Sequence, residues 1–148
     1  MELSKLIKKD LMCYISAQTK KEALSEIVEM LYEQKSIVDV TGIKKMILAR
    51  EELMSTGIGL EIGVPHVRTE GIASPIIGIG ISKQGVADYV SLDNKPVKLI
   101  FMIIVDKGAH KEYIQLLSQV ATMLKDEDLR NKLIGAESID EAYQYLSA

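Results

Sequence analysis

Apolar residues at helical spacing predict five helices, two in the first third of the chain and three in the last. The first begins after Thr19, which forms a capping box with Glu22, and ends at a turn near Gln34. The second starts at about Val40. The apolar rows of the five helices are Leu24, Ile27, Val28 and Leu31; Ile43, Met46 and Ile47; Tyr113, Leu116, Leu117, Val120 and Leu124; Leu129 and Leu133; and Ile139, Ala142, Tyr143 and Leu146. On the second helix the next position of the row is Arg50, which either reaches solvent or points into a site at the helix end.

Apolar runs of strand length lie between the two groups of helices. Ile76–Ser82 alternates isoleucine with Gly78 and Gly80, so a neighbouring element can approach closely on the glycine side. Val97–Val105 is apolar almost throughout, which predicts a central strand covered on both faces. The pattern predicts three or so strands in this middle part of the chain, in addition to a short strand near Met12–Ile15. The order of elements indicates an α/β fold of mixed α+β type, a three-layer α/β/α sandwich whose mixed β-sheet is flanked by helices on both faces.

Composition predicts one soluble domain over residues 1–148. The chain is 47% hydrophobic and 26% charged, and no apolar run approaches the roughly 20 residues of a membrane-spanning helix. The N-terminus does not resemble a signal peptide, so we expect a cytoplasmic protein without membrane insertion. The net charge of −3 comes from 18 basic and 21 acidic residues without a basic stripe, which argues against nucleic acid as a partner. With one cysteine and no ligand cluster, we expect neither a metal nor another cofactor.

The first candidate for chemistry is His66, one of two histidines. Neutral imidazole can attack an electrophile such as phosphorus near neutral pH. Pro65 biases the residue before it toward an extended conformation, so we expect His66 at the end of a strand. In the preceding segment Ser55–Gly59, small residues let backbone N–H groups converge on an anion and hydroxyls add donors, although a glycine-rich turn alone is weak evidence. A histidine hydrogen-bonded at a strand edge is the competing interpretation.

Longer segments carry a more specific resemblance. Arg50–Gly59, with the sequence REELMSTGIG, is followed by Val64-Pro65-His66. Together they resemble the active-site region of the enzyme IIA components of the bacterial phosphoenolpyruvate-dependent phosphotransferase system, in the fructose, mannitol and nitrogen-regulatory class. Residues 91–101 and 112–121 resemble the same class, in particular its nitrogen-regulatory branch, so the resemblance covers nearly the whole chain.

The resemblance implies that His66 accepts a phosphoryl group on Nε2 from the histidine-containing phosphocarrier protein or a relative. His66 would then pass the group to a transporter IIB component or a regulatory partner, which makes the protein a phosphotransferase component with a phosphohistidine intermediate. Arg50 would offset charge on the phosphoryl oxygens, Thr56 would donate a hydrogen bond, and Gly57 and Gly59 would let the loop come close. Taken alone, Arg50 is explained as a solvated helix end and Thr56 as a local turn; together with His66 they favour function.

The chain departs from the family pattern at two places. A second histidine usually opens the helix after the central strand, but the matching position here is Tyr113. His110, one helical turn earlier, can substitute for it or be an exposed loop residue, and Tyr113 can donate through its hydroxyl or simply pack. The family usually has glycine after the active histidine, whereas this chain has Val67 and then Arg68. Val67 favours an extended backbone, and Arg68 is explained by phosphate binding or by an ordinary surface charge.

The leading hypothesis is therefore a phosphoryl carrier modified on His66. The alternative is a nitrogen-regulatory-type binding protein, without sugar transport, in which phosphorylation is a switch or is lost; the departures at Tyr113 and Val67 motivate it. A metal hydrolase is disfavoured because the two histidines lie far apart in sequence, without a His-Glu-x-x-His pattern.

Overall fold

The computed structural model describes residues 2–147. In this range the α-helices are α1 (Lys20–Glu33), α2 (Val40–Leu53), α3 (His110–Met123), α4 (Glu127–Gly135) and α5 (Ile139–Ser147). The strands are β1 (Met12–Tyr14), β2 (Gly57–Gly59), β3 (Ile62–Gly63), β4 (His66–Thr69), β5 (Ile76–Val86) and β6 (Val97–Asp106). Two short 3-10 helices, η1 (Leu3–Lys5) and η2 (Lys9–Leu11), precede β1. The five predicted helices all form, and the Thr19 hydroxyl caps α1 by accepting from the Glu22 N–H.

The described strands form one mixed sheet in the order β1-β5-β6-β3-β2, with β4 also paired to β6. β5 and β6 are antiparallel, and β1 runs parallel to β5. β3 and β4 lie one after the other along the same edge of β6, parallel to it, with Ile62 opposite Leu99 and His66 opposite Ile103. Between these two strands the Pro65 carbonyl accepts from the Ile103 N–H at 2.9 Å. The backbone around His66 is thereby held by β6.

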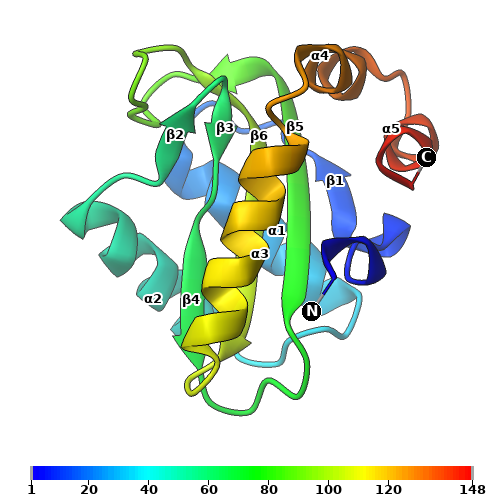
Figure 1. The fold of residues 1–148 in the computed structure, drawn as a ribbon. Coiled ribbons are helices and arrows are strands. Elements are labelled where there is room, and N and C mark those ends of the chain that lie inside the picture. The colour runs from blue at the N-terminus through cyan, green and yellow to red at the C-terminus, as the bar shows by residue number, and fades with distance from the viewer. Residues whose placement is uncertain (1, 148) are drawn as a thin grey trace.

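Helices cover both faces of the sheet, with α3 in front of it and α1 behind it in Figure 1. The cause is visible in β6, whose side chains alternate between two hydrophobic cores. Leu99, Phe101, Ile103 and Val105 pack in the core that includes α3, α4 and α5, whereas Ile100, Met102 and Ile104 pack in the core that includes α1 and α2. The predicted three-layer sandwich is confirmed. None of the helices in residues 2–147 has the length and apolar character needed to cross a membrane.

The glycines of β5 allow α1 to lie close against the sheet. A Cβ atom on Gly80 would lie 2.5 Å from Ile15 Cδ1 and 2.8 Å from Ile27 Cδ1. A Cβ atom on Gly78 would lie 3.0 Å from Ile27 Cγ2. The predicted close approach on the glycine side is therefore confirmed.

The strands differ from the prediction in number and length. Six form in the described range rather than about four, and β5 continues past Ser82 to Val86. β2 and β3, which have three and two residues, were not predicted, whereas the strand expected at His66 forms as the four-residue β4. Such short, partly glycine-rich segments do not display the alternation by which strands are recognised. They matter here because β4 carries His66.

Candidate functional site

His66 lies at an end of a strand, as the first residue of β4. Val67 continues the strand opposite Ile104, so the backbone after His66 is extended as its β-branched side chain predicts. The imidazole is half-buried, whereas the Val67 side chain is buried. His66 is thus presented by a short strand whose other residues anchor it.

Tyr113, in the first turn of α3, contacts the imidazole directly. Its hydroxyl oxygen lies 2.9 Å from Nδ1 of His66, and the two rings stack with centroids 4.2 Å apart. Tyr113 is 8% exposed, and burial raises the pKa of its hydroxyl, so the group stays protonated at neutral pH. His110, the exposed first residue of α3, contacts the Tyr113 ring with a centroid separation of 6.4 Å. Of the two candidate helper residues, Tyr113 is therefore the one that the fold brings against His66.

A cavity of about 590 Å³ opens beside His66. Its lining residues are Met46, Ala49, Arg50, Leu53, His66, Val67, Arg68 and Lys107. The fold thus brings Arg50 and Arg68 into one cavity with His66. We did not predict the third cation, Lys107, from the sequence; its one signal there is its position directly after the central strand.

Arg50 is anchored at the end of its own helix while it lines the cavity. Its Nη1 donates to the Met54 carbonyl oxygen at 2.8 Å. The last carbonyls of a helix have no partner within the helix and attract positive charge. The end of α2 therefore holds the guanidinium beside β4, one of the two outcomes considered for Arg50.

The pKa of His66 is lower than its ordinary value. Burial is the largest cause, and the positive charge of Arg50 is the next. A hydrogen bond to the Val64 backbone and the negative charge of Glu51 act in the opposite direction, while Arg68 lowers the pKa further. His66 is therefore a neutral imidazole at neutral pH, the form that has a lone pair for nucleophilic attack.

A buried polar cluster, formed by Glu51, Thr56, Tyr89 and Lys20, lies beside the start of β2. Glu51 Oε2 accepts from the Thr56 hydroxyl at 2.6 Å, and Glu51 Oε1 accepts from the Thr56 N–H at 3.1 Å. Lys20 Nζ forms an ion pair with the same carboxylate at 2.7 Å, and the Tyr89 hydroxyl contacts the Thr56 hydroxyl. Because the single hydroxyl hydrogen of Thr56 goes to Glu51, donation from Thr56 to a phosphoryl group requires this bond to break.

Glu51 is a site-supporting residue that we did not select from the sequence. The signal was present in α2, where the buried residues Ile43, Ile47 and Glu51 follow one another at intervals of four. A carboxylate that continues an apolar row is buried with it and needs polar partners there.

Gly57 and Gly59 fit β2 closely against the loop that precedes β6. A Cβ atom on Gly57 would lie 2.3 Å from the Val90 carbonyl oxygen, and Gly59 has a φ of +92° that favours glycine. Their N–H groups donate to the hydroxyls of Ser55 and Ser91. The expected convergence of these N–H groups on an anion is thus corrected to a packing role, because protein hydroxyls already occupy them.

Comparison with known proteins identifies the family. Residues 5–148 match the family described as phosphoenolpyruvate-dependent sugar phosphotransferase system, EIIA 2. The chain belongs to this enzyme IIA family. The resemblance seen in the sequence, from Arg50–Gly59 and Val64-Pro65-His66 onward, is thereby confirmed at the level of the family.

This enzyme IIA chain is similar both to sugar-specific and to regulatory relatives. The fructose-specific EIIABC component of Bacillus subtilis is 40% identical over 126 residues, which are 85% of this chain and 20% of the Bacillus protein. The nitrogen regulatory protein of Pseudomonas aeruginosa is 35% identical over 126 residues, 85% of this chain and 81% of that protein. The crystal structure of nitrogen regulatory protein IIA-Ntr from Neisseria meningitidis matches with a TM-score of 0.86 and 26% identity, over 97% of this chain and 98% of that one.

We expect His66 of this enzyme IIA protein to titrate below its ordinary pKa of 6.5. As pH falls through the lowered pKa, the imidazole gains a proton and loses its nucleophilic lone pair, so phosphoryl acceptance decreases on the acid side. Arg50→Gln should raise the pKa, because it removes a positive charge that disfavours the imidazolium. NMR titration of the ring protons measures both effects.

The matched control for this titration is Lys125→Gln, which also removes one positive charge. Lys125 is exposed and lies two residues after the last residue of α3, whereas Tyr113 lies in the first turn of that helix. This variant should leave the pKa of His66 unchanged. A wild-type His66 that titrates at or above pH 6.5 would contradict the electrostatics described above.

Proposed function

We propose that the protein is a phosphoryl carrier of the phosphotransferase system, with His66 as the acceptor. The observation that carries the proposal is a half-buried, neutral imidazole beside a cavity lined by cations, with Arg50 among them. The imidazole supplies the nucleophile, and a guanidinium supplies paired donors that match phosphoryl oxygens.

In the proposed step, the lone pair of His66 Nε2 attacks the phosphorus of a phosphohistidine on the histidine-containing phosphocarrier protein. A P–N bond forms at Nε2 while the donor's P–N bond breaks, and the electron pair of that bond returns to the donor imidazole. In this step the ring proton of His66 is on Nδ1, the nitrogen beside the Tyr113 hydroxyl, so the free lone pair is on Nε2. No proton has to move when the other ring nitrogen of the donor phosphohistidine is protonated, because the donor then leaves as a neutral imidazole, and the protein contributes position and charge.

The remaining candidates receive supporting roles in the proposal. Tyr113 orients the imidazole through the contact of its hydroxyl with Nδ1. Thr56, Gly57 and Gly59 shape the loop that carries the end of α2 into β2. His110 is an auxiliary residue that acts through the Tyr113 ring.

Exposed apolar side chains beside the cavity support a protein partner. Leu53 lines the cavity and is 83% exposed, and the neighbouring Met54 is 70% exposed. Val90, also exposed, is joined to this segment because its carbonyl accepts from the Ser55 hydroxyl. Large apolar side chains that gather on a surface mark protein contacts. We propose that the phosphocarrier protein docks on this surface.

A regulatory role is the second candidate. The similarity to a nitrogen regulatory protein extends over 85% of this chain and 81% of that protein's length, which supports this candidate as the fructose-specific relative supports the first. In a regulatory version, phosphorylation adds about two negative charges at His66 and changes which partner binds. In a transport version, a IIB component receives the phosphoryl group. Either version places the relay in the cytoplasm.

The test of the proposal incubates the protein with phosphoenolpyruvate, the first enzyme of the relay and the phosphocarrier protein. Intact-mass measurement should show the gain of one phosphoryl group that survives base and is lost in acid, as a phosphohistidine is. An unchanged mass of the wild-type protein would overturn the proposal. Adding a IIB domain then separates the two roles, because transfer to IIB supports a relay and a retained label with altered partner affinity supports regulation.

A further inference from the structure

Three cations line the His66 cavity without a carboxylate partner. The ion pairs among residues 2–147 leave out Arg50, Arg68 and Lys107. Elsewhere on the surface a lysine such as Lys98 does pair, with its Nζ 3.3 Å from a carboxylate oxygen of Glu61. Like charges in one cavity repel one another, and an anion bound there relieves the repulsion. The cavity therefore favours the binding of an anion.

The backbone directs Arg68 and Lys107 to the same place as His66. Arg68 follows His66 by two residues in β4, and side chains two apart in a strand project from the same side. Lys107 follows Asp106, which lies opposite Thr69, and its N–H donates to the Thr69 carbonyl at 3.0 Å. The pairing of β4 with β6, which holds His66, thus also holds these two cations beside it.

We propose that Arg68 and Lys107, together with Arg50, bind the oxygens of the phosphoryl group carried by His66. Such a group has about two negative charges at neutral pH, which Arg50 alone does not balance. Tyr113, the other side chain against the imidazole, carries no positive charge. The inference rests on the proposed function and adds two phosphoryl-binding residues to it.

The positive charge of these side chains should change the pKa of the phosphoryl group, which can be measured. Cations beside a phosphoryl group favour its dianion and lower the pKa of its second ionisation. Loss of one exposed cation should raise that pKa by about half a unit, because the attraction is weak in a cavity open to water. The other charged or titratable groups around the site are Arg50 and Glu51 on α2 and His110 and Tyr113 on α3, and all four stay in place in the variants below.

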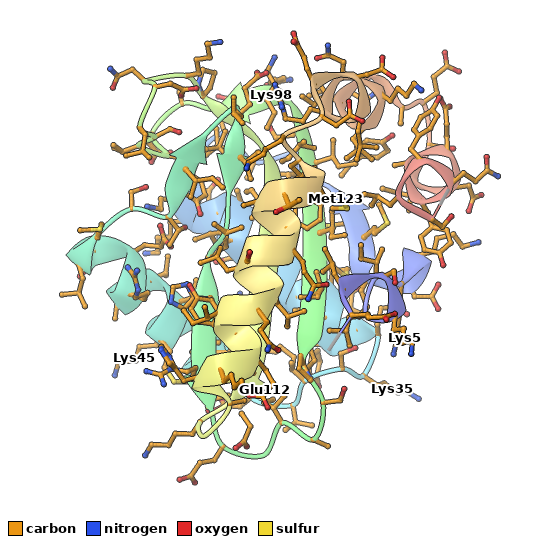
Figure 2. All side chains as sticks on the ribbon, in the orientation of Figure 1. Lys5, Lys35, Lys45, Lys98, Glu112 and Met123 are labelled. Carbon is orange, nitrogen blue, oxygen red and sulfur yellow. The ribbon has the colours of Figure 1, made fainter. Side chains whose placement is uncertain are left out.

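The test is a pH titration of the isolated phosphoprotein by phosphorus NMR. Arg68→Gln and Lys107→Gln should each raise the pKa of the phosphoryl group by about half a unit, and the double variant by about one unit. Arg68→Lys keeps the charge and should titrate as the wild type does. In the control Lys125→Gln the pKa of the phosphoryl group should not move. Lys125 lies two residues after Met123, and Met123 and Glu112 lie at opposite ends of α3 in Figure 2. An unchanged pKa in the double variant would overturn the inference.

Two further results distinguish phosphoryl binding by these cations from attraction of a partner and from failure of the proposed function. If Arg68 and Lys107 only attract a partner, the double variant slows phosphoryl acceptance and leaves the titration of the phosphoprotein unchanged, which refutes phosphoryl binding. If the wild-type protein accepts no phosphoryl group, the proposed function fails, and inorganic phosphate then tests the cations by themselves. NMR of the His66 ring should show phosphate binding that is about fivefold or more weaker in the double variant; equal binding would refute the inference.

Discussion

A His66→Gln protein takes up no phosphoryl group from the phosphocarrier protein, a loss of at least ~10³-fold in the rate of acceptance. Glutamine has a similar reach but lacks a nucleophilic nitrogen, because the lone pair of its amide is delocalised. The wild-type imidazole is neutral at neutral pH and opens into the cavity of Arg50, Arg68 and Lys107. Intact mass after incubation with the complete relay measures the loss.

His110→Gln is the matched control, since it makes the same replacement at the other histidine. His110 is exposed and contacts the Tyr113 ring, so its loss should slow acceptance by no more than about threefold. Thermal unfolding of both variants verifies that each is folded. A phosphoryl label that persists on His66→Gln, or an equal loss of label in the two variants, would show that His66 is not the phosphoryl acceptor.

Glu51→Gln lowers the free energy of unfolding by about 3 kcal/mol, the largest change in stability that we expect from one polar substitution. The Glu51 side chain is 3% exposed and that of its partner Lys20 is 15% exposed. The substitution leaves the Lys20 ammonium largely buried without a counter-charge and weakens the acceptor for the Thr56 hydroxyl. Urea unfolding of the variant and the wild type measures the difference.

An exposed ion pair provides the control for this prediction. Asp128 and Lys132 pair across one turn of α4 at 3.1 Å, with side chains 78% and 51% exposed, so Asp128→Asn should cost less than about 0.5 kcal/mol. Lys20→Met combined with Glu51→Gln should cost at least about 1 kcal/mol less than the sum of the single variants, because the double variant leaves no unpaired charge. A cost below about 1 kcal/mol for Glu51→Gln would show that water reaches the cluster.

Elements long enough to repeat their pattern could be predicted from the sequence. The apolar rows of the helices recur over several turns, and Val97–Val105, which is apolar at all but one position and of strand length, indicated a central strand. The same periodicity placed Arg50 at the end of an apolar row, and the structure has Arg50 lining the His66 cavity, whereas the buried row itself ends at Glu51. Pro65 indicated that His66 lies at the end of a strand, but the extent of this short strand could not be predicted, because it exists through its pairing with β6 rather than through an apolar pattern of its own.

The surroundings of His66 required the tertiary structure. Lys107 reaches the cavity because β4 pairs with the end of β6, a contact between residues far apart in the chain. The sequence left open whether Tyr113 or His110 helps His66, and the phase of α3 relative to β4 places Tyr113 against the ring. Thr56 was expected to face a phosphoryl group, but the carboxylate of Glu51 competes for its hydroxyl. Competition of this kind depends on burial and distance, which the order of residues does not contain.

Because β6 holds the backbone at Pro65 and at His66, we expect the carrier to keep one shape in both of its states. A partner then cannot sense the occupied state from a moved loop or a rotated helix. It has to detect the added negative charge, and in physiological salt the electrostatic potential of that charge decays over about 8 Å. Loaded and empty copies would look alike from a distance, and a partner would tell them apart only after it has already touched them.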